Sequence, residues 1–428
     1  MRRLFLATFC VVALLTKTTP DASQSRLGTI ESIVERGTYR LDDSTFINTI
    51  DKVRRDGHYY SHQPPLLSAL EAPVYWALHL SGARFHNRGR FLMTWAFTLL
   101  TNGLALSLTV LVFANILTMA GVPPPLREAL ALLLPMGTWL LPYGLVANNH
   151  GISGLLVTVL IWLLLKIEWQ GATPVRALAI GNVLGLLAAI EILPLVSFVP
   201  VAAVELFLRR DFGGRLRVLF ISGLAAPLVA HAALNIPITG DVIPAGFHTE
   251  MFRFEGSGFE ESSLTGTLKH DSIAALASYA WQSLFAGKGF FVFAPLCFLG
   301  ALSGVLGWRW WRSRAVGTHA VLMISLAISL AVSLLMTNNF GGGSVGFRHA
   351  AYLSPAFAVL VLPWIAREAT RRRRNVVTIV AGASVLLLFV YAAREPWSPL
   401  TVSAATIGAW DQYLPLAGRI ARGDLLIP

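Results

Sequence analysis

The chain has 428 residues, of which 55% are hydrophobic and 13% charged, and its formal net charge is +11 at pH 7. A soluble domain carries about twice that charged fraction, so the composition excludes an ordinary soluble protein and indicates a polytopic membrane protein. In such a protein the excess of basic residues indicates topology and contact with anionic lipid. The sequence contains no basic patch interleaved with aromatic residues, so nothing indicates binding to nucleic acid. The two cysteines, Cys10 and Cys297, lie in apolar runs, which argues against a disulfide framework or a thiolate metal site.

The N-terminal part predicts a membrane anchor followed by a long polar stretch. Arg2 and Arg3 precede an apolar run over residues 4–16, and no small-x-small cleavage site follows it, so we expect an uncleaved anchor with its N-terminus in the cytoplasm. Residues 17–90 are dense in ionisable groups. Because such groups are costly in lipid, this stretch is predicted to lie at or outside the membrane surface and to carry the chemistry.

Two helices are expected inside this stretch. Apolar residues spaced three or four apart from Leu27 to Val34 predict an amphipathic helix that ends at Gly37 and lies on the membrane surface. Pro64 and Pro65 begin a second, semi-apolar segment over residues 66–80, which is either a surface helix or a membrane span.

The remainder of the chain is dominated by apolar runs. Those long enough to span a bilayer lie at 91–117, 126–147, 151–168, 177–190, 192–208, 217–235, 290–307, 318–336, 350–365 and 376–392. With the first helix they predict about eleven transmembrane helices. The predicted fold class is therefore all-α: a polytopic membrane domain over residues 1–392 with long outer loops at 17–90 and 236–289, then a short extracytoplasmic tail, 393–428.

Arginine placement predicts the topology. Three short basic connections, 209–217, 309–314 and 367–374, are each separated from the next by two spans, so all three should lie in the cytoplasm. Arg84, Arg88 and Arg90 disagree with this arrangement, but long loops obey the charge rule poorly. We expect a multi-pass protein of the plasma (inner) membrane. The polar side chains that this topology gathers on the outer face are the candidate site residues: Asp21, Asp51, Lys52, His58, Tyr60, His62, Gln63, His150, Glu191, Lys288, Arg348 and His349.

Several short motifs occur in a fixed order along this outer face. They are Glu35-Arg36-Gly37, Asp51-Lys52-Val53, Tyr60-Ser61-x-x-Pro64-Pro65-Leu66-Leu67, Asn148-Asn149-His150, Gly287-Lys288-Gly289 and Gly346-Phe347-Arg348-His349. In this order, and after a short first helix and an acidic residue, they resemble the GT-C integral-membrane glycosyltransferases, in particular the protein O-mannosyltransferase and aminoarabinose-transferase group. The resemblance extends from residue 2 to about residue 392.

The resemblance implies a reaction and roles for the candidate residues. Such enzymes transfer a sugar from a polyprenyl-phosphate donor to an extracytoplasmic acceptor, which is a glycan, a lipid or a protein. One carboxylate can suffice as general base because phosphate leaves without full protonation, and Asp21 is the first choice with Asp51 second. Lys52, Lys288, Arg348 and the backbone amides of 341–343 are suited to the donor phosphate.

This chain also departs from the family pattern. Asp21-Ala22 stands where the group has an acidic pair, and Gln63 stands where a lysine usually precedes the proline pair. The donor phosphate site is therefore expected to be altered.

Structural and functional alternatives stay open. Asp21 is well placed to be a helix N-cap, and Asp51 with Lys52 can be a solvated ion pair. His58 and His62 are compatible with a divalent metal, but they lie in a predicted loop, so their four-residue spacing is not the helical i, i+4 spacing of a metal site, and no metal ligand or cofactor is assigned. The alternative function is a transporter or flippase for a lipid-linked or small anionic solute, against which stands the lack of an internal repeat.

Overall fold

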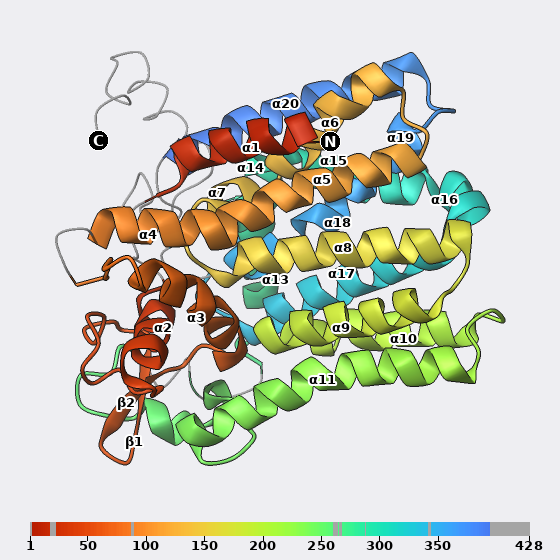
Figure 1. Cartoon of the computed structure of the whole chain (residues 1–428). Helices are drawn as coiled ribbons and strands as arrows, with labels where there is room; N and C mark the ends of the chain where they lie inside the picture. Colours follow the sequence, from red (N-terminus) through yellow and green to blue (C-terminus); the bar gives the residue numbers. More distant parts are fainter. Residues whose placement is uncertain are drawn as a thin grey trace.

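The computed structural model describes residues 2–17, 23–86, 90–259, 264, 268–286, 288–340 and 344–393. It is a bundle of helices that run roughly along one direction, and residues 23–86 form a smaller region against one end of it (Figure 1). This confirms the predicted mainly helical fold. One described element departs from the all-α expectation, because the smaller region contains a two-stranded antiparallel hairpin.

The helices follow the predicted apolar runs. In chain order the elements are α1 (Arg2–Leu15), α2 (Gln24–Arg36), β1 (Lys52–Arg55), β2 (His58–Ser61), α3 (Pro65–His79), α4 (Arg90–Thr98), the π-helix η2 (Leu99–Gly103), α5 (Leu104–Met119), α6 (Pro124–Met136), α7 (Leu140–Gly144), α8 (Asn149–Gln170), α9 (Pro174–Ile190), η3 (Leu193–Leu195), α10 (Phe198–Leu208), α11 (Gly214–Thr239), η4 (Ala245–Phe247), η5 (Thr249–Phe252), α13 (Ile273–Leu284), α14 (Phe290–Phe293), α15 (Pro295–Leu306), α16 (Trp308–Arg314), α17 (Val316–Met336), η6 (Arg348–Leu353), α18 (Ser354–Val359), α19 (Leu362–Ile365) and α20 (Arg371–Ala393).

Among the described residues, four helices are long and apolar enough to cross a membrane: Phe91–Met119, Asn149–Gln170, Gly214–Thr239 and Val316–Met336. Shorter apolar helices cover Pro174–Ile190, Leu193–Leu208 and Pro295–Leu306. Prolines shorten others: the predicted run 350–365 is divided, and Pro355 and Pro363 each lie in the first turn of a new helix. The count of about eleven spans stays a prediction.

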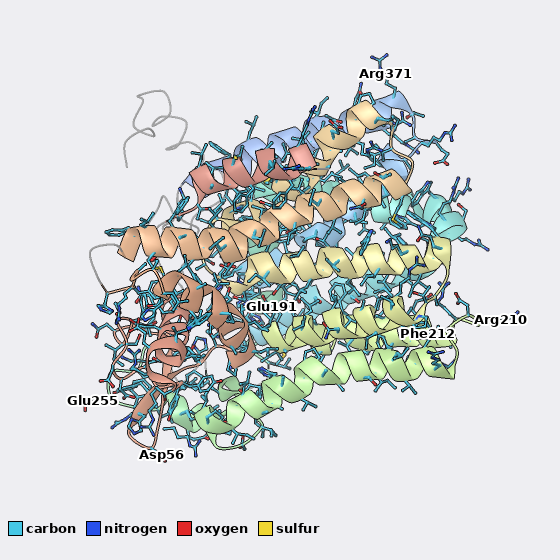
Figure 2. The ribbon with its side chains drawn as sticks, in the orientation of Figure 1. Asp56, Glu191, Arg210, Phe212, Glu255 and Arg371 are labelled. Carbon is cyan, nitrogen blue, oxygen red and sulfur yellow. The ribbon has the colours of Figure 1, made fainter. Side chains whose placement is uncertain are left out.

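The basic connections lie at one end of the bundle, as predicted. Figure 2 shows Arg210 and Arg371 at the end opposite Asp56. The connection 309–314 lies at the same end as the connection 367–374, because Arg314 Nη2 is 2.6 Å from a carboxylate oxygen of Glu368. The predicted separation of a basic end from an end that carries residues 23–86 is thus present in the fold, and the side of the membrane that each end faces stays a prediction.

Helix α2 forms where the sequence predicts it. It ends at Gly37, whose backbone is left-handed (φ 64°) and whose N–H donates to the carbonyl of Ile33. Both faces of α2 are buried, its polar residues Arg26 and Glu31 included, since α3, β2 and residues 38–49 surround it. The structure therefore buries in protein a helix that was expected to lie on the membrane surface.

The sequence of the turn explains why β1 and β2 form a hairpin. Asp56 (φ 51°) and Gly57 (φ 83°) connect β1 to β2, and Arg55 pairs with His58. Positive φ at two successive residues is the geometry of the type I′ turn, for which Asp-Gly is a preferred sequence. The signal is present in the sequence, although the expectation of an all-α fold did not use it.

The two predicted outer loops pack against each other. Val53 and Tyr60 of the hairpin form a small apolar cluster with Ile238 from the last turn of α11 and with Met251 and Phe252 from the segment that follows it. Residues nearly two hundred positions apart thus become neighbours, and the hairpin is held at the end of α11.

Close helix packing positions the end of α9. A Cβ atom on Gly181 would lie 2.0 Å from the carbonyl oxygen of Phe220, and one on Gly223 would lie 2.3 Å from that of Leu178. Because no other residue allows this approach, α9 and α11 are locked side by side. Glu191, which directly follows α9, is thereby fixed where the bundle meets residues 23–86 (Figure 2).

Candidate active site

Most of the predicted site residues come together at this meeting point, although they lie far apart in sequence. Asp21 lies outside the described residues, so its position stays a prediction. The residues that the structure gathers are Asp51, His62, Gln63, His150, Glu191, Lys288, Arg348 and His349.

Arg26 of α2 lies at the centre of the site. Its side chain is 4% exposed and donates from Nη1 to Asn149 Oδ1 (3.4 Å) and from Nη2 to Gln63 Oε1 (3.3 Å). Its Nε has no hydrogen-bond partner among the described residues, and none of the described carboxylates forms an ion pair with it. Burial lowers the pKa of Arg26, and the more distant charges of Glu71, Glu191 and Asp51, in that order, oppose the effect.

A network at the start of α8 connects this arginine to Glu191. The side-chain oxygen of Asn148 caps α8 and accepts the backbone N–H of His150 at 2.7 Å, which fixes the first turn. Asn149 Nδ2 and His150 Nδ1 then meet the same oxygen, Glu191 Oε1, at 2.5 and 3.0 Å. The amide of Asn149 therefore links the guanidinium of Arg26 to the carboxylate of Glu191.

His62 is held in one tautomer between two partners. Its Nδ1 lies 3.2 Å from the backbone carbonyl of Asp51, to which it donates, and its Nε2 accepts from Gln63 Nε2 at 3.0 Å. Burial lowers the pKa of His62, Asp51 raises it, and the charges of Arg348 and Arg26 lower it further. The ring is therefore neutral at pH 7.

The two remaining cations lie where short helices begin: Lys288 just before α14 and Arg348 as the first residue of η6. Lys288 is 2% exposed and donates from Nζ to the carbonyl of Ser344 at 2.5 Å. Burial, followed by the charge of Arg348, lowers the pKa of Lys288 to about 8. Burial lowers the pKa of His349 to about 3, with the charges of Arg348, His150 and Lys288 adding to the effect, and its Nε2 has no hydrogen-bond partner among the described residues.

Three predicted residues lie in the local structure beside the site. Lys52 Nζ donates to the carbonyl of Ile47 (2.6 Å), and Tyr60 lies in the apolar cluster of the hairpin. His58 Nδ1 lies 3.3 Å from a carboxylate oxygen of Asp42. His58 and His62 stand at opposite ends of β2 with different partners, so the fold does not pair them as metal ligands.

The sequence analysis did not select Arg26, Glu71 or Asn149. The apolar spacing gave no signal for Arg26, which directly precedes Leu27, the first apolar residue of the predicted amphipathic helix. A signal for Glu71 existed, because it interrupts the semi-apolar segment 66–80, and the structure leaves its side chain 6% exposed. Burying an ionisable group is costly unless it is paired, so the burial of both side chains points to a site.

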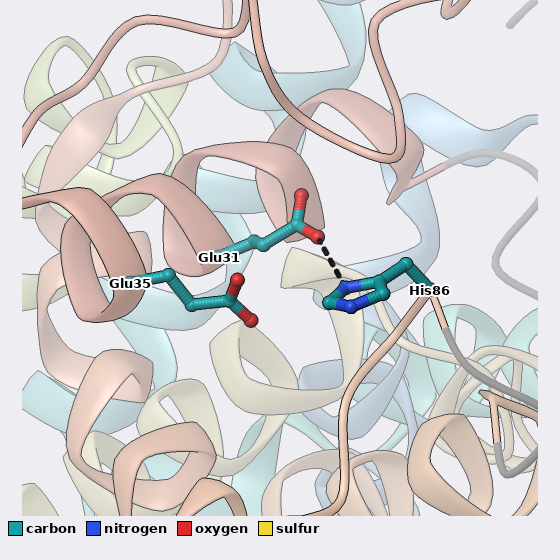
Figure 3. Close-up of side chains that lie close together, drawn as sticks. All are labelled: Glu31, Glu35 and His86. Atoms are coloured by element: carbon teal, nitrogen blue, oxygen red, sulfur yellow. Dashed lines mark ion pairs between the residues drawn. The ribbon is translucent and has the colours of Figure 1, made fainter.

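A second group of ionisable side chains lies behind α2. Figure 3 shows Glu31, Glu35 and His86, whose nearest ligand atoms all lie within 4.8 Å of one another. Arg36 Nη2 and Nη1 lie 3.6 and 3.8 Å from oxygens of Glu31 and Glu35. Arg36 therefore pairs with both carboxylates, and Arg84 Nη1 lies 3.9 Å from Glu35 Oε2.

Protein donors also occupy these carboxylates. Glu31, 1% exposed, accepts from Ser44 Oγ (2.5 Å), Thr45 N (2.9 Å) and Thr45 Oγ1 (2.6 Å), and Glu35 accepts from the hydroxyl of Tyr75 (2.5 Å). The group thus anchors the segment after α2, and α3, to α2.

The chemistry of the main site follows from these contacts. Three cationic side chains, Arg26, Lys288 and Arg348, converge near carboxylates and a neutral imidazole at the ends of helices. Buried or half-buried cations suit a phosphate, and carboxylates held nearby can accept a proton.

The structure is similar to crystal structures of the oligosaccharyltransferase of Archaeoglobus fulgidus. The similarity covers 91% of this chain with a TM-score of 0.51 for the apo form, and 91% with a TM-score of 0.53 for the form tethered to an acceptor peptide that contains the NVT sequon. The similarity is one of fold, and it agrees with the resemblance to GT-C glycosyltransferases that the sequence motifs indicate. Sequence identity is 12% in both comparisons, and this chain spans about half the length of those proteins (55% and 54%). No protein-family model matches the chain, and no curated protein matches it either.

Proposed function

We propose that this protein is a membrane glycosyltransferase that moves a sugar from a polyprenyl-phosphate donor to an acceptor outside the cytoplasm. The observation that carries the proposal is the position of Arg26, a buried guanidinium without an ion pair among the described residues, within a GT-C fold. A buried charge of this kind calls for an anionic partner. The archaeal neighbour whose structure holds a tethered acceptor peptide supports the transfer of a sugar to an acceptor.

In this proposal the donor phosphate lies between Arg26, Arg348 and Lys288. Gln63 and Asn149 hold the guanidinium of Arg26 in place through its two Nη atoms, which leaves Nε toward the ligand. The cations stabilise the negative charge that develops on the phosphate as the sugar departs.

Asp21 or Asp51 is the proposed general base. The carbonyl of Asp51 fixes His62, and its carboxylate charge acts on both His62 and Arg26, so this residue lies beside the proposed phosphate site. The base removes the proton of an acceptor hydroxyl of a glycan, a lipid or a protein as that hydroxyl attacks the anomeric carbon. No cofactor is assigned, and a divalent metal stays an open alternative.

We further propose that the protein lies in the plasma (inner) membrane with its basic end in the cytoplasm. Residues 1–392 then form the membrane enzyme, 17–90 and 236–289 its outer loops, and 393–428 an outer tail. The site is built from helix termini: Asn149 begins α8, Glu191 follows α9, and Arg348 begins η6. A transporter requires its site near the middle of the bundle, so this placement favours the enzyme.

The test uses purified protein in detergent with a panel of radiolabelled polyprenyl-phosphate sugars. Release of free polyprenyl phosphate is followed with and without a cell-envelope extract. We expect extract-dependent release that falls by about 10²–10⁴-fold in Asp21→Asn or Asp51→Asn, with unchanged thermal unfolding. Full activity of both variants would refute the choice of base, and binding of a donor without any turnover would favour the transporter.

A further inference from the structure

Glu71 of α3 is a buried carboxylate without a described partner. Its side chain is 6% exposed, and among the described residues no hydrogen bond or ion pair satisfies its oxygens. Other carboxylates in this region have hydrogen-bond donors: Glu31, Glu35 and Glu191 each accept hydrogen bonds from side chains or backbone. A carboxylate buried without such partners has a function or is kept neutral.

The charge that acts on Glu71 is that of Arg26. Burial raises the pKa of Glu71 to about 7, and Arg26 opposes the rise. In turn, Glu71 is the carboxylate with the largest effect on Arg26. The two side chains thus form an incomplete pair: each is more than nine-tenths buried, the Nε of Arg26 is unpartnered, and they do not reach ion-pair contact.

We propose that Glu71 and an anionic ligand compete for Arg26, so that binding of the anion is coupled to uptake of one proton by Glu71. This inference rests on the proposed function, because it needs an anion at Arg26. The proton goes from solvent to a carboxylate oxygen of Glu71 as the anion takes over the guanidinium, and it returns to solvent when the anion leaves. A protonated Glu71 then no longer repels the phosphate.

Other charges act on this pair, and the elements packed on α3 carry further titratable groups. Glu191, at the end of α9, and Asp51, before β1, act on Arg26 of α2, and α11 carries the buried His231. Of these, only Arg26 shifts the pKa of Glu71. The pH dependence of anion binding near neutrality is therefore assigned to Glu71.

The direction of the effect follows from the charge of Glu71. Below about pH 7 the carboxyl is neutral and the anion binds tightly; above it the carboxylate competes and binding weakens. If the bound anion raises the pKa of Glu71 by about one unit, affinity falls about threefold between pH 6 and pH 7.5, and about 0.4 proton is taken up at pH 7.

The experiment measures binding of farnesyl methyl phosphate to the full chain in detergent. This probe is a phosphodiester, whereas a phosphate monoester would itself titrate near pH 6. Calorimetry in buffers of different ionisation enthalpy counts the protons taken up by the wild-type protein, so one readout needs no variant. Glu71→Gln should bind the probe tightly and lose the pH dependence below about pH 7.5, and the exposed Glu255→Gln should behave as wild type.

The outcomes separate the two proposals. Binding with no proton uptake at pH 7, or a pH dependence that survives in Glu71→Gln, would overturn the coupling and leave the proposed function standing. Absence of binding at every pH would overturn both. Because Lys288 also lies at the anion site and its pKa is about 8, the proton count is repeated on Lys288→Arg, whose guanidinium does not titrate in this range, so that the count decides even if Glu71→Gln fails to fold.

Discussion

Replacing Arg26 by methionine tests the proposed centre of the site. Methionine keeps the apolar stem of the side chain and removes the guanidinium. Truncating one partner of a buried, hydrogen-bonded charge pair costs about 2–5 kcal/mol, and every 1.4 kcal/mol is about tenfold in affinity. We therefore expect Arg26→Met to bind a polyprenyl phosphate at least about 30-fold more weakly than the wild-type protein.

The same substitution should change stability little. It removes two long hydrogen bonds from a charged donor to neutral amides, at 3.3 and 3.4 Å, which together contribute about 3–6 kcal/mol. It also removes a buried charge that has no ion pair among the described residues, and burying such a charge costs several kcal/mol. The two contributions nearly offset each other.

The assay pairs equilibrium binding of a polyprenyl phosphate with thermal unfolding in the same detergent. Arg36→Met is the matched control on the same helix, because Arg36 is a quarter exposed and pairs with Glu31 and Glu35 behind the site. We expect the control to lose stability and keep binding. If instead Arg26→Met unfolds at a much lower temperature and still binds the probe normally, Arg26 is a structural residue and the proposed phosphate site is wrong.

Two further predictions concern Lys288 and the hairpin turn. Burial lowers the pKa of Lys288 to about 8 from 10.5, so donor affinity should fall above pH 8 as the ammonium deprotonates, whereas Lys288→Arg should keep its affinity there. Because the unfolded chain binds the Lys288 proton more tightly than the folded chain, the free energy of unfolding should rise from pH 8 to about pH 10.5. If chemical denaturation shows that it falls over this range, the lowered pKa of Lys288 is wrong. Gly57→Ala should lower stability by about 1 kcal/mol, since the position has φ 83° and no atom nearby to clash with the new methyl group; an unchanged unfolding temperature would show that the turn is not strained.

The class of protein and the outline of the helices could be predicted from the sequence. Hydrophobic runs define helices wherever lipid or protein removes water, because each helix satisfies its own backbone hydrogen bonds. The end of α2 at Gly37 was likewise predictable, since a left-handed residue that terminates a helix is a local property. The alternation of basic connections with apolar runs predicted that residues 209–217, 309–314 and 367–374 share one end of the bundle.

The tertiary structure decided which polar side chains meet. Arg26 contacts Asn149 across 123 positions of sequence, and Asn149 reaches Glu191 across 42 more. No local pattern encodes such contacts, because hydrogen-bond partners are chosen by the packing of whole helices. The burial of both faces of α2, and the burial of Glu71 without a partner among the residues that the structure describes, likewise depend on which elements surround them. The sequence by itself therefore determined where ionisable residues interrupt the apolar pattern, and only the fold decided which of them share a site, since the cost of burying a charge depends on its neighbours in space.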